Sequence, residues 1–319
     1  MSDNRSAWKA LVPWLAVFVL LLFVPRFLPR FHVYLLGLIF TTGLLAVSLN
    51  LVLGLGGMYQ FHHAVFYGIG AYTVAIVITK TTLSPCIGFL LAPVVSALLS
   101  LAIGLICVRL SKLYFGMLQI SLGSLVWAVV FRWYSFTGGD DGIHGIPVPD
   151  IISSTDGAYY FSLILTAICL IVMQRIVNSP FGRSFQAVRD NPVRSEAVGI
   201  NVKRVQLTGM VISGAFAGIA GSLFVVIEGS VFPELMFWTL SLEIIIMCLL
   251  GGWFTFLGPM LGAAIIVLLR TVVGIYTEYW TLVLGIVLML LILFLPQGVL
   301  GFFLEKFKRG GMKAVQERK

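Results

Sequence analysis

The residues that could bind or move a polar ligand inside the apolar stretches of this chain are Asn50, His62, His63, Gln119, Glu228 and Glu243. Adjacent side chains on a helix diverge by about 100°, so His62 and His63 do not form the two-histidine face of a metal site. A carboxylate in lipid costs about 3 kcal/mol or more unless it faces a cavity or a partner. These residues indicate either buried structural contacts or a polar path. The side chains that we predict to line such a path are Asn50, His63, Gln119 and Glu243.

The sequence lacks the residue patterns that are typical of enzymes. GxSxG, HExxH and GxxxxGK[ST] are absent, and so are paired carboxylates at helical spacing. The cysteines lie in separate apolar runs without a CxxC pair, at Cys86, Cys107, Cys169 and Cys248. We therefore predict no catalytic residue, no metal and no cofactor, and any ATP must be bound by another subunit.

Glycine, with 33 copies, is the most informative residue type. Two GxxxG motifs occur, at Gly214 and Gly218 and at Gly258 and Gly262. Small residues at this spacing let membrane helices approach closely, which favours helix packing within the chain, with a second membrane subunit as the alternative. The Gly54-Leu55-Gly56-Gly57 run could instead unwind a helix and expose its backbone to a polar ligand, so Gly56 and Gly57 join the predicted path.

The connector 178–206 differs in kind from the apolar stretches. It suits two short amphipathic helices, Ser184–Arg189 and Val193–Val198, with a hinge at Asn191-Pro192 and a C-cap at Gly199. Such helices could dock in a groove of a cytoplasmic partner. The alternative is a helix that lies on anionic lipid, which explains the charge but not the hinge and the cap.

The composition requires a membrane to position these residues. Of the 319 residues, 59% are hydrophobic and 11% are charged, against roughly 45–50% and 25% in soluble domains. The mean hydropathy is +1.03. A net charge of +8 then indicates Lys and Arg in cytoplasmic loops rather than a nucleic-acid partner.

Stretches without charged residues predict an all-α, polytopic membrane protein of about ten transmembrane helices, which forms a single transmembrane domain over residues 1–319. The first apolar run, Ala10–Pro25, has no cleavage site after it and is predicted to be retained. The connector 133–158 holds four Asp and no Lys or Arg, so we place it outside. The connector 178–206 and the tail 305–319 are basic, so we place both, and both termini, in the cytoplasm.

A weak internal repeat accompanies this pattern. Leu53–Gly57 and Leu249–Gly252 each precede a turn with aromatic residues and a helix with glycines. Duplicated halves are common in transporters, which bind substrate between the repeats. The alternative is that Gly and Leu dominate any membrane chain.

Four blocks in this order resemble the inner-membrane permease subunits of branched-chain amino acid ABC importers, second permease type. They are SLNLVLGLGGMYQFHHAVFYGIGAYT (48–73), TGGDDGIHGIP (137–147), SPFGRSFQAVRDNPVRSEAVGINVKRVQL with ISGAFAGIAGSL (179–223) and SLEIIIMCLLGGWFTFLGPMLGAA (241–264). The resemblance places His63 on the family's histidine and His62 where the family usually has glycine. It also identifies the connector 178–206 as a coupling loop. The predicted coupling residues are Arg183, Arg189, Asp190, Glu196, Ala197 and Gly199.

The resemblance implies a permease subunit in a bacterial inner membrane that works by alternating access. The implied partners are a second permease, two ATP-binding subunits, a periplasmic or lipid-anchored substrate-binding protein and membrane lipid. Two alternatives stay open. The first is a related importer of urea, amides or aromatic acids. The second is a stand-alone ion-coupled transporter, which would need ionisable residues deep in its spans.

Overall fold

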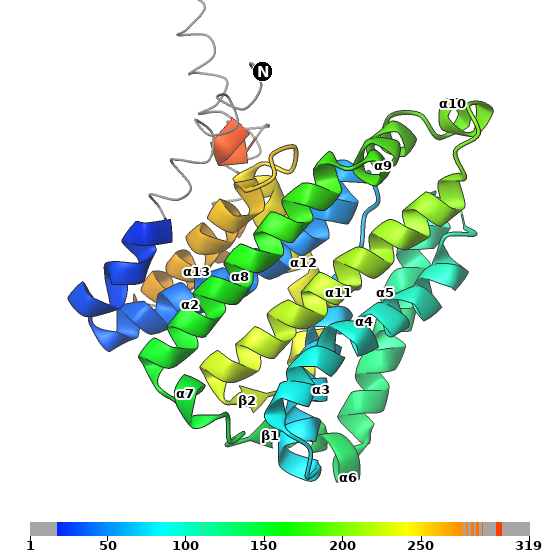
Figure 1. Cartoon of the computed structure of the whole chain (residues 1–319). Coiled ribbons are helices and arrows are strands. Elements are labelled where there is room, and N and C mark those ends of the chain that lie inside the picture. Colours follow the sequence, from blue (N-terminus) through cyan, green and yellow to red (C-terminus); the bar gives the residue numbers. More distant parts are fainter. Residues whose placement is uncertain are drawn as a thin grey trace, which may run out of the picture.

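The computed structural model describes residues 18–110, 112–276 and 298–301, with a few single positions between 279 and 289. Within this part of the chain, long helices lie side by side in one bundle (Figure 1). Seven of the described helices are long and apolar enough to cross a membrane, which confirms the prediction of an all-helical, polytopic membrane protein. They are α2 (Arg30–Asn50), extended by the π-helical turn η1 (Leu51–Leu55), α3 (His63–Lys80), α4 (Pro85–Cys107), α5 (Lys112–Arg132), α8 (Thr155–Asn178), α11 (Val202–Glu228) and α13 (Gly258–Tyr276).

Two shorter apolar helices, Phe18–Phe27 and α12 (Trp238–Gly251), accompany the long ones. The beginning of the predicted first span, and most of the predicted last span at 279–304, lie outside the described residues. The basic tail 305–319 lies outside them as well. The described helices therefore establish a polytopic chain, and the total of ten spans stays a prediction.

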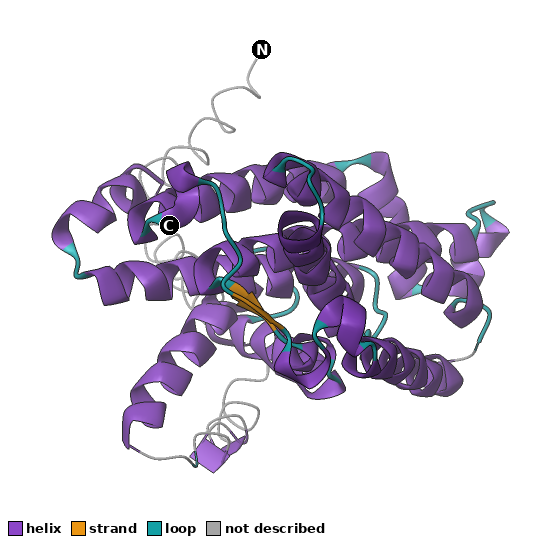
Figure 2. Cartoon of the chain, turned by 90° about the horizontal axis from the view of Figure 1, so that it is seen from below, coloured by secondary structure: helices purple, strands orange, loops and turns teal. Residues whose placement is uncertain are grey.

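Short elements gather at the two ends of the bundle. At one end, α6 (Tyr134–Thr137), η2 (Gly139–Asp141), β1 (Ile143–His144) and α7 (Asp150–Ser153) connect α5 to α8. There β1 pairs antiparallel with β2 (Ser230–Val231), which is followed by η3 (Pro233–Met236). Figure 2 shows this strand pair, in orange, among the helices. At the opposite end, α9 (Pro180–Asp190) and α10 (Pro192–Ala197) project from the bundle (Figure 1).

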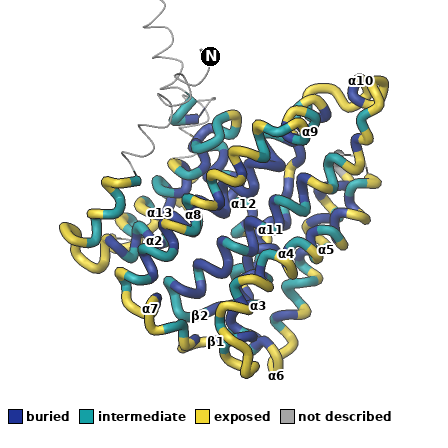
Figure 3. Tube along the Cα trace, viewed as in Figure 1, coloured by how far each residue is buried: buried dark blue, intermediate teal, exposed yellow. Residues whose placement is uncertain are grey.

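The helices α2, α3 and α11 form the buried centre of the bundle, whereas fewer than a third of the residues in the apolar windows of α4, α5 and α8 are buried (Figure 3). Glycine lets α3 and α11 touch: a Cβ atom on Gly70 would lie 2.3 Å from the carbonyl oxygen of Gly218. Serine hydroxyls of α4 donate to backbone carbonyls of both helices, from Ser96 to Phe66 of α3 (2.9 Å) and from Ser100 to Met210 of α11 (2.9 Å). Close backbones and interhelical hydrogen bonds replace the hydrophobic effect, which is absent between helices in lipid.

Both GxxxG motifs pack within the chain. Gly214 and Gly218 of α11 face Ser100 and Ser96 of α4, where added Cβ atoms would lie 2.6 Å and 2.7 Å from the two serine Cβ atoms. On α13, Gly262 lies against the backbone of α12, and a Cβ atom there would be 1.9 Å from the carbonyl oxygen of Met247. Gly258 meets the turn that joins α12 to α13.

The chain breaks its helices where the glycine runs predict it. The first break follows η1, and α3 begins only at His63, so residues 56–62 form a non-helical segment. The second break, residues 252–257, separates α12 from α13. Gly57 (φ +66°) and Gly252 (φ +106°) adopt backbone conformations that a side chain would strain. Non-helical backbone at membrane depth is tolerated where protein surrounds it, and most of residues 56–62 are buried.

Candidate functional site

The two helix breaks lie against each other. Asn50, at the end of α2, donates from Nδ2 to the carbonyl oxygen of Thr255 in the second break (3.1 Å). A Cβ atom on Gly54 would lie 2.1 Å from the carbonyl oxygen of Trp253, so only glycine permits this approach. The two glycine-rich motifs that sequence analysis pairs as a repeat are thus neighbours in space. Their origin as repeated halves stays a prediction.

The helix α9 covers the first break. Phe185 is buried (1% exposed), and its ring fills the space where Cβ atoms of Gly56 and Gly209 would be, 2.2 Å and 2.4 Å from Cζ. The side chain of Arg189 runs alongside Gly57, whose Cβ atom would lie 2.6 Å from Arg189 Cγ. Gly56 and Gly57 therefore lie at the junction with α9.

Arg189 joins α9 to both breaks. Its Nη1 donates to the carbonyl oxygen of Gly54 (2.7 Å), which the end of the helix leaves available. Its guanidinium lies over the ring of Phe254 in the second break, 5.8 Å from the ring centre. Its Nε and Nη2 donate to Oδ1 of Asp190 (2.9 Å and 2.8 Å). One side chain thus holds three segments of the chain together.

Most other residues of α9 and α10, which together form the 180–197 arm, are exposed. Asn191 caps α10 by accepting from the backbone N–H of Arg194 (2.9 Å), and Pro192 begins that helix. The hinge between two short helices is therefore present where sequence analysis predicts it. Gly199 adopts φ +89°, with nothing near a Cβ atom. Arg183, Glu196, Ala197 and Gly199 are exposed. Sequence analysis did not single out Val193 and Val198, which are 78% and 73% exposed.

A layer of buried polar groups surrounds His63. Its Nε2 lies 2.8 Å from Ser48 Oγ of α2, and its Nδ1 lies 3.0 Å from Gln60 Oε1. Ser241 of α12 accepts from the backbone N–H of Ala64 (3.0 Å), and Ser213 of α11 donates to the carbonyl oxygen of Ser48 (2.6 Å). This layer links four helices. Sequence analysis missed Ser48, Gln60, Ser213 and Ser241, although polar residues inside apolar runs were the available signal.

Gln119 and His62, both named above as polar residues in apolar stretches, lie beside this layer. Gln119 of α5 is buried and accepts from the backbone N–H of Phe61 (3.2 Å). His62 is buried and precedes α3 as its N-cap, so the two histidines do not share a helix. Tyr59 of the first break is 50% exposed, and its ring centre lies 6.4 Å from those of Phe61 and Trp253.

Glu228 and Glu243 occupy different depths. Glu228 ends α11 at the end of the bundle away from α9 and accepts from the hydroxyl of Tyr34. Glu243 of α12 lies deeper in the bundle, away from that end. Ser241, two residues before it, bonds the first turn of α3. The cause is the 230–236 segment, which returns into the bundle, where Gly68 would place a Cβ atom 2.2 Å from Met236 Cγ.

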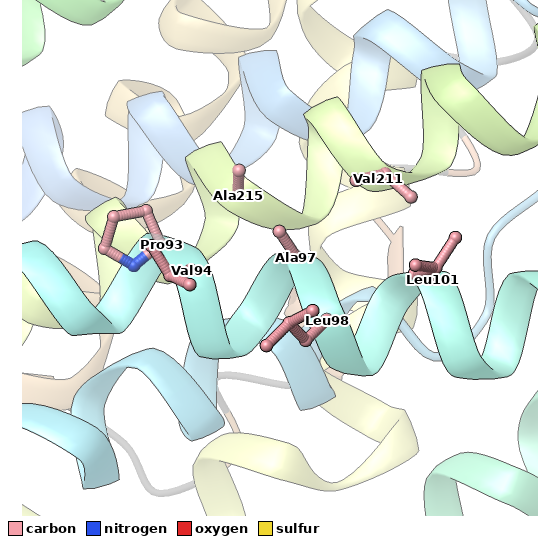
Figure 4. A pocket seen from close by; sticks show the side chains of 7 residues that line it. All are labelled: Pro93, Val94, Ala97, Leu98, Leu101, Val211 and Ala215. Carbon is pink, nitrogen blue, oxygen red and sulfur yellow. The ribbon is translucent and has the colours of Figure 1, made fainter.

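The groove in Figure 4 is apolar, in contrast to the polar layer around His63. It lies between Pro93–Leu101 of α4 and Val211 and Ala215 of α11, and its lining side chains are all apolar. It offers a surface for acyl chains rather than for a polar ligand. Among the described residues, no three His, Cys, Asp or Glu side chains gather as they would around a metal ion.

Comparison with known proteins gives a consistent result. Residues 31–293 match the family model described as branched-chain amino acid transport system / permease component. The chain is 30% identical, over 86% of its length and 71% of the relative, to the high-affinity branched-chain amino acid transport system permease protein LivM of Salmonella typhimurium. It is 27% identical to the probable LivM permease of Methanocaldococcus jannaschii, covering 78% of this chain and 81% of the relative. It is 24% identical to LivH of Salmonella typhimurium, covering 82% and 91%. No solved structure matches.

Proposed function

Because this chain belongs to the family of permease components of branched-chain amino acid transport systems, we propose that it forms half of the membrane path of an importer for leucine, isoleucine and valine. The chain is a transport protein and not itself an ATPase. Relatives named LivM and LivH both match it, which supports pairing with a second, LivH-like permease. Two ATP-binding subunits and a periplasmic or lipid-anchored binding protein complete the assembly that we propose. Related importers of urea, amides or aromatic acids are the alternative.

We place the 180–197 arm in the cytoplasm of a bacterial inner membrane. The end of the bundle that carries the arm is rich in basic residues, which supports this orientation. They are Arg109, Arg175, Arg183, Arg189, Arg194, Lys203 and Arg204. The exposed Asp140, Asp141, Asp150 and Asp156 lie at the other end, in the outer connector 133–158. Ten spans in two repeated halves, with both termini and the tail 305–319 in the cytoplasm, complete the proposed topology.

The observation that carries the coupling proposal is the contact of Arg189 with Gly54. Closure of the ATP-binding subunits displaces the arm, and Arg189 passes the displacement to both helix breaks. The exposed Val193 and Val198 supply apolar contact for docking. The proposed coupling set is Arg183, Arg189, Asp190, Glu196, Ala197 and Gly199.

The path itself runs beside the breaks. Tyr59 presents an exposed ring on the first break, and the polar layer of His63 and Gln119 lies behind it. Asn50, Gly56 and Gly57 lie at the contacts that hold the breaks in place. Glu243 places a carboxylate deep inside the bundle. Movement of the breaks opens the path to one side and then to the other.

Reconstitution tests this function. Proteoliposomes that hold the chain with its second permease and ATP-binding subunits are expected to accumulate leucine only with ATP and loaded binding protein. The chain alone should transport nothing. Gradient-driven uptake by the chain alone would instead establish a stand-alone ion-coupled transporter.

The outer connector provides a separate prediction. The double variant Asp140→Asn with Asp141→Asn should weaken stimulation of ATP hydrolysis by the binding protein several-fold, because exposed charges steer association. The difference should shrink at high salt, where such charges are screened. The measurement is ATPase activity against binding-protein concentration at two ionic strengths. Arg132→Gln, an exposed change of opposite sign at the same end, is the control and should not weaken stimulation. Unchanged stimulation in the double variant contradicts the docking role.

A further inference from the structure

Three buried side chains at the start of α3 carry nitrogen atoms without a well-formed hydrogen bond, and the ring of His62 lies within reach of the Gln119 side chain. The atoms are Gln60 Nε2, Gln119 Nε2 and both ring nitrogens of His62. They are four of the nine unpartnered buried side-chain atoms in the part of the chain that the structure describes. The side chains are at most 1% exposed. Buried polar groups in native proteins almost always have a hydrogen-bond partner, so a concentration of unpartnered donors points to a ligand-binding site.

These atoms surround one helix N-terminus. His62 immediately precedes the 18-residue helix α3, and Gln60 binds the ring of His63, its first residue. Gln119 binds the backbone of Phe61, one residue before His62. The backbone of α5 lies close to His62 at Gly123, where an added Cβ atom would be 2.9 Å from His62 Cβ. The N-terminus of a helix carries a partial positive charge and attracts anions.

Three of the four unpartnered nitrogens are hydrogen-bond donors when His62 is neutral. The backbone N–H of Phe61 requires an oxygen at its partner, so Gln119 accepts through Oε1 and keeps a free NH₂. The Ser48 hydroxyl lies within hydrogen-bond distance of both the Leu45 carbonyl oxygen and His63 Nε2. When it donates to Nε2, a neutral His63 carries its proton on Nδ1 and donates to Gln60 Oε1, which leaves the Gln60 NH₂ free. A neutral His62 adds one N–H. The two amide oxygens are already used, and the second ring nitrogen of His62 is the one acceptor among the unpartnered atoms, so this donor-rich cluster matches a carboxylate better than an ammonium group.

We propose that His62, Gln60 and Gln119 bind the α-carboxylate of the transported substrate at the N-terminus of α3. This inference rests on the proposed function and names the group that the path recognises. Along the first break, Met58, Gln60 and His62 are buried, whereas Gly57 and Tyr59 are exposed. The segment therefore covers the donors in the state described, and its displacement brings them to the path. Leucine, isoleucine and valine all carry this carboxylate, so the site recognises amino acids as a class and does not distinguish their side chains.

Gln119→Glu tests the proposal with little change of shape. The glutamate still accepts from the N–H of Phe61 but replaces the free donor with a negative charge. We expect leucine transported per ATP hydrolysed to fall at least about tenfold, while loaded binding protein still stimulates ATP hydrolysis. Ser162→Ala removes another unpartnered buried hydroxyl, on α8, and should leave the ratio unchanged. An unchanged ratio in Gln119→Glu would overturn the proposal and mean that the donors hold ordered water only.

A measurement on the unaltered transporter covers the case in which the variant does not assemble. Leucine should raise the melting temperature of the complex without binding protein, and 3-methylbutylamine, which has the same side chain and amine but no carboxylate, should not. Equal shifts, or none with leucine, would refute the carboxylate site. Failure of the proposed function is distinguishable, because the unaltered transporter would then accumulate no leucine in the presence of ATP and loaded binding protein.

Discussion

Replacement of Arg189 by methionine is expected to lower substrate uptake by at least about tenfold while ATP hydrolysis continues. The guanidinium is the group that ties α9 to both helix breaks, through Gly54 and Phe254. A hydrogen bond from a charged donor contributes about 1.5–3 kcal/mol, and each 1.4 kcal/mol is a factor of ten. Methionine keeps much of the packing beside Gly57 but loses both contacts. The measurement is the ratio of leucine uptake to phosphate release in the same proteoliposomes.

Two variants control for other effects of this change. Arg189→Lys keeps a charge that can reach the Gly54 carbonyl but loses the planar fork that lies over Phe254, so an intermediate ratio is expected. Arg175→Met removes an exposed arginine from the last turn of α8 at the same end of the bundle and should leave the ratio unchanged. If Arg189→Met lowers uptake and hydrolysis equally, the residue acts in docking of the ATP-binding subunits and not in transmission to the breaks.

Gly262→Val is expected to prevent stable folding. A Cβ atom at this position would lie 1.9 Å from the carbonyl oxygen of Met247 and 3.0 Å from the backbone nitrogen of Gly251. Both obstacles are backbone atoms of α12, which cannot rotate away, so the two helices must separate. Overpacking of a core costs about 1–3 kcal/mol and more where the backbone must shift. We expect a large loss of the protein from the membrane fraction and of thermal stability in detergent.

Gly274→Val on the same helix is the matched control. Nothing lies within 4 Å of a Cβ atom there, and valine favours helix over glycine by a few tenths of a kcal/mol. Its stability should therefore equal or slightly exceed that of the unaltered chain. Similar behaviour of the two variants would mean that close contact between α12 and α13 does not limit stability.

The local features of the chain could be predicted from its sequence. Composition and the length of charge-free runs predict a helical membrane protein, because hydropathy reports directly on the solvent around a segment. Glycine and proline predict the breaks at residues 54–57 and 251–258, and also the hinge at Asn191-Pro192, because these residues act on their own backbone. The coupling loop stands out because it is amphipathic and basic in an otherwise apolar chain.

Only the tertiary structure decides which of these features meet. Sequence analysis treats the two breaks and the arm as separate features, whereas Arg189, Gly54 and Phe254 join them. The apolar runs do not predict that residues 230–236 return into the bundle and carry Glu243 with them. Sequence analysis also misses the serines around His63. The reason is physical: lipid is as apolar as the inside of the bundle, so an apolar helix carries little periodic signal of which face its neighbours cover. Glycine contacts and a few polar hydrogen bonds select that face, and both depend on partners far away in the sequence.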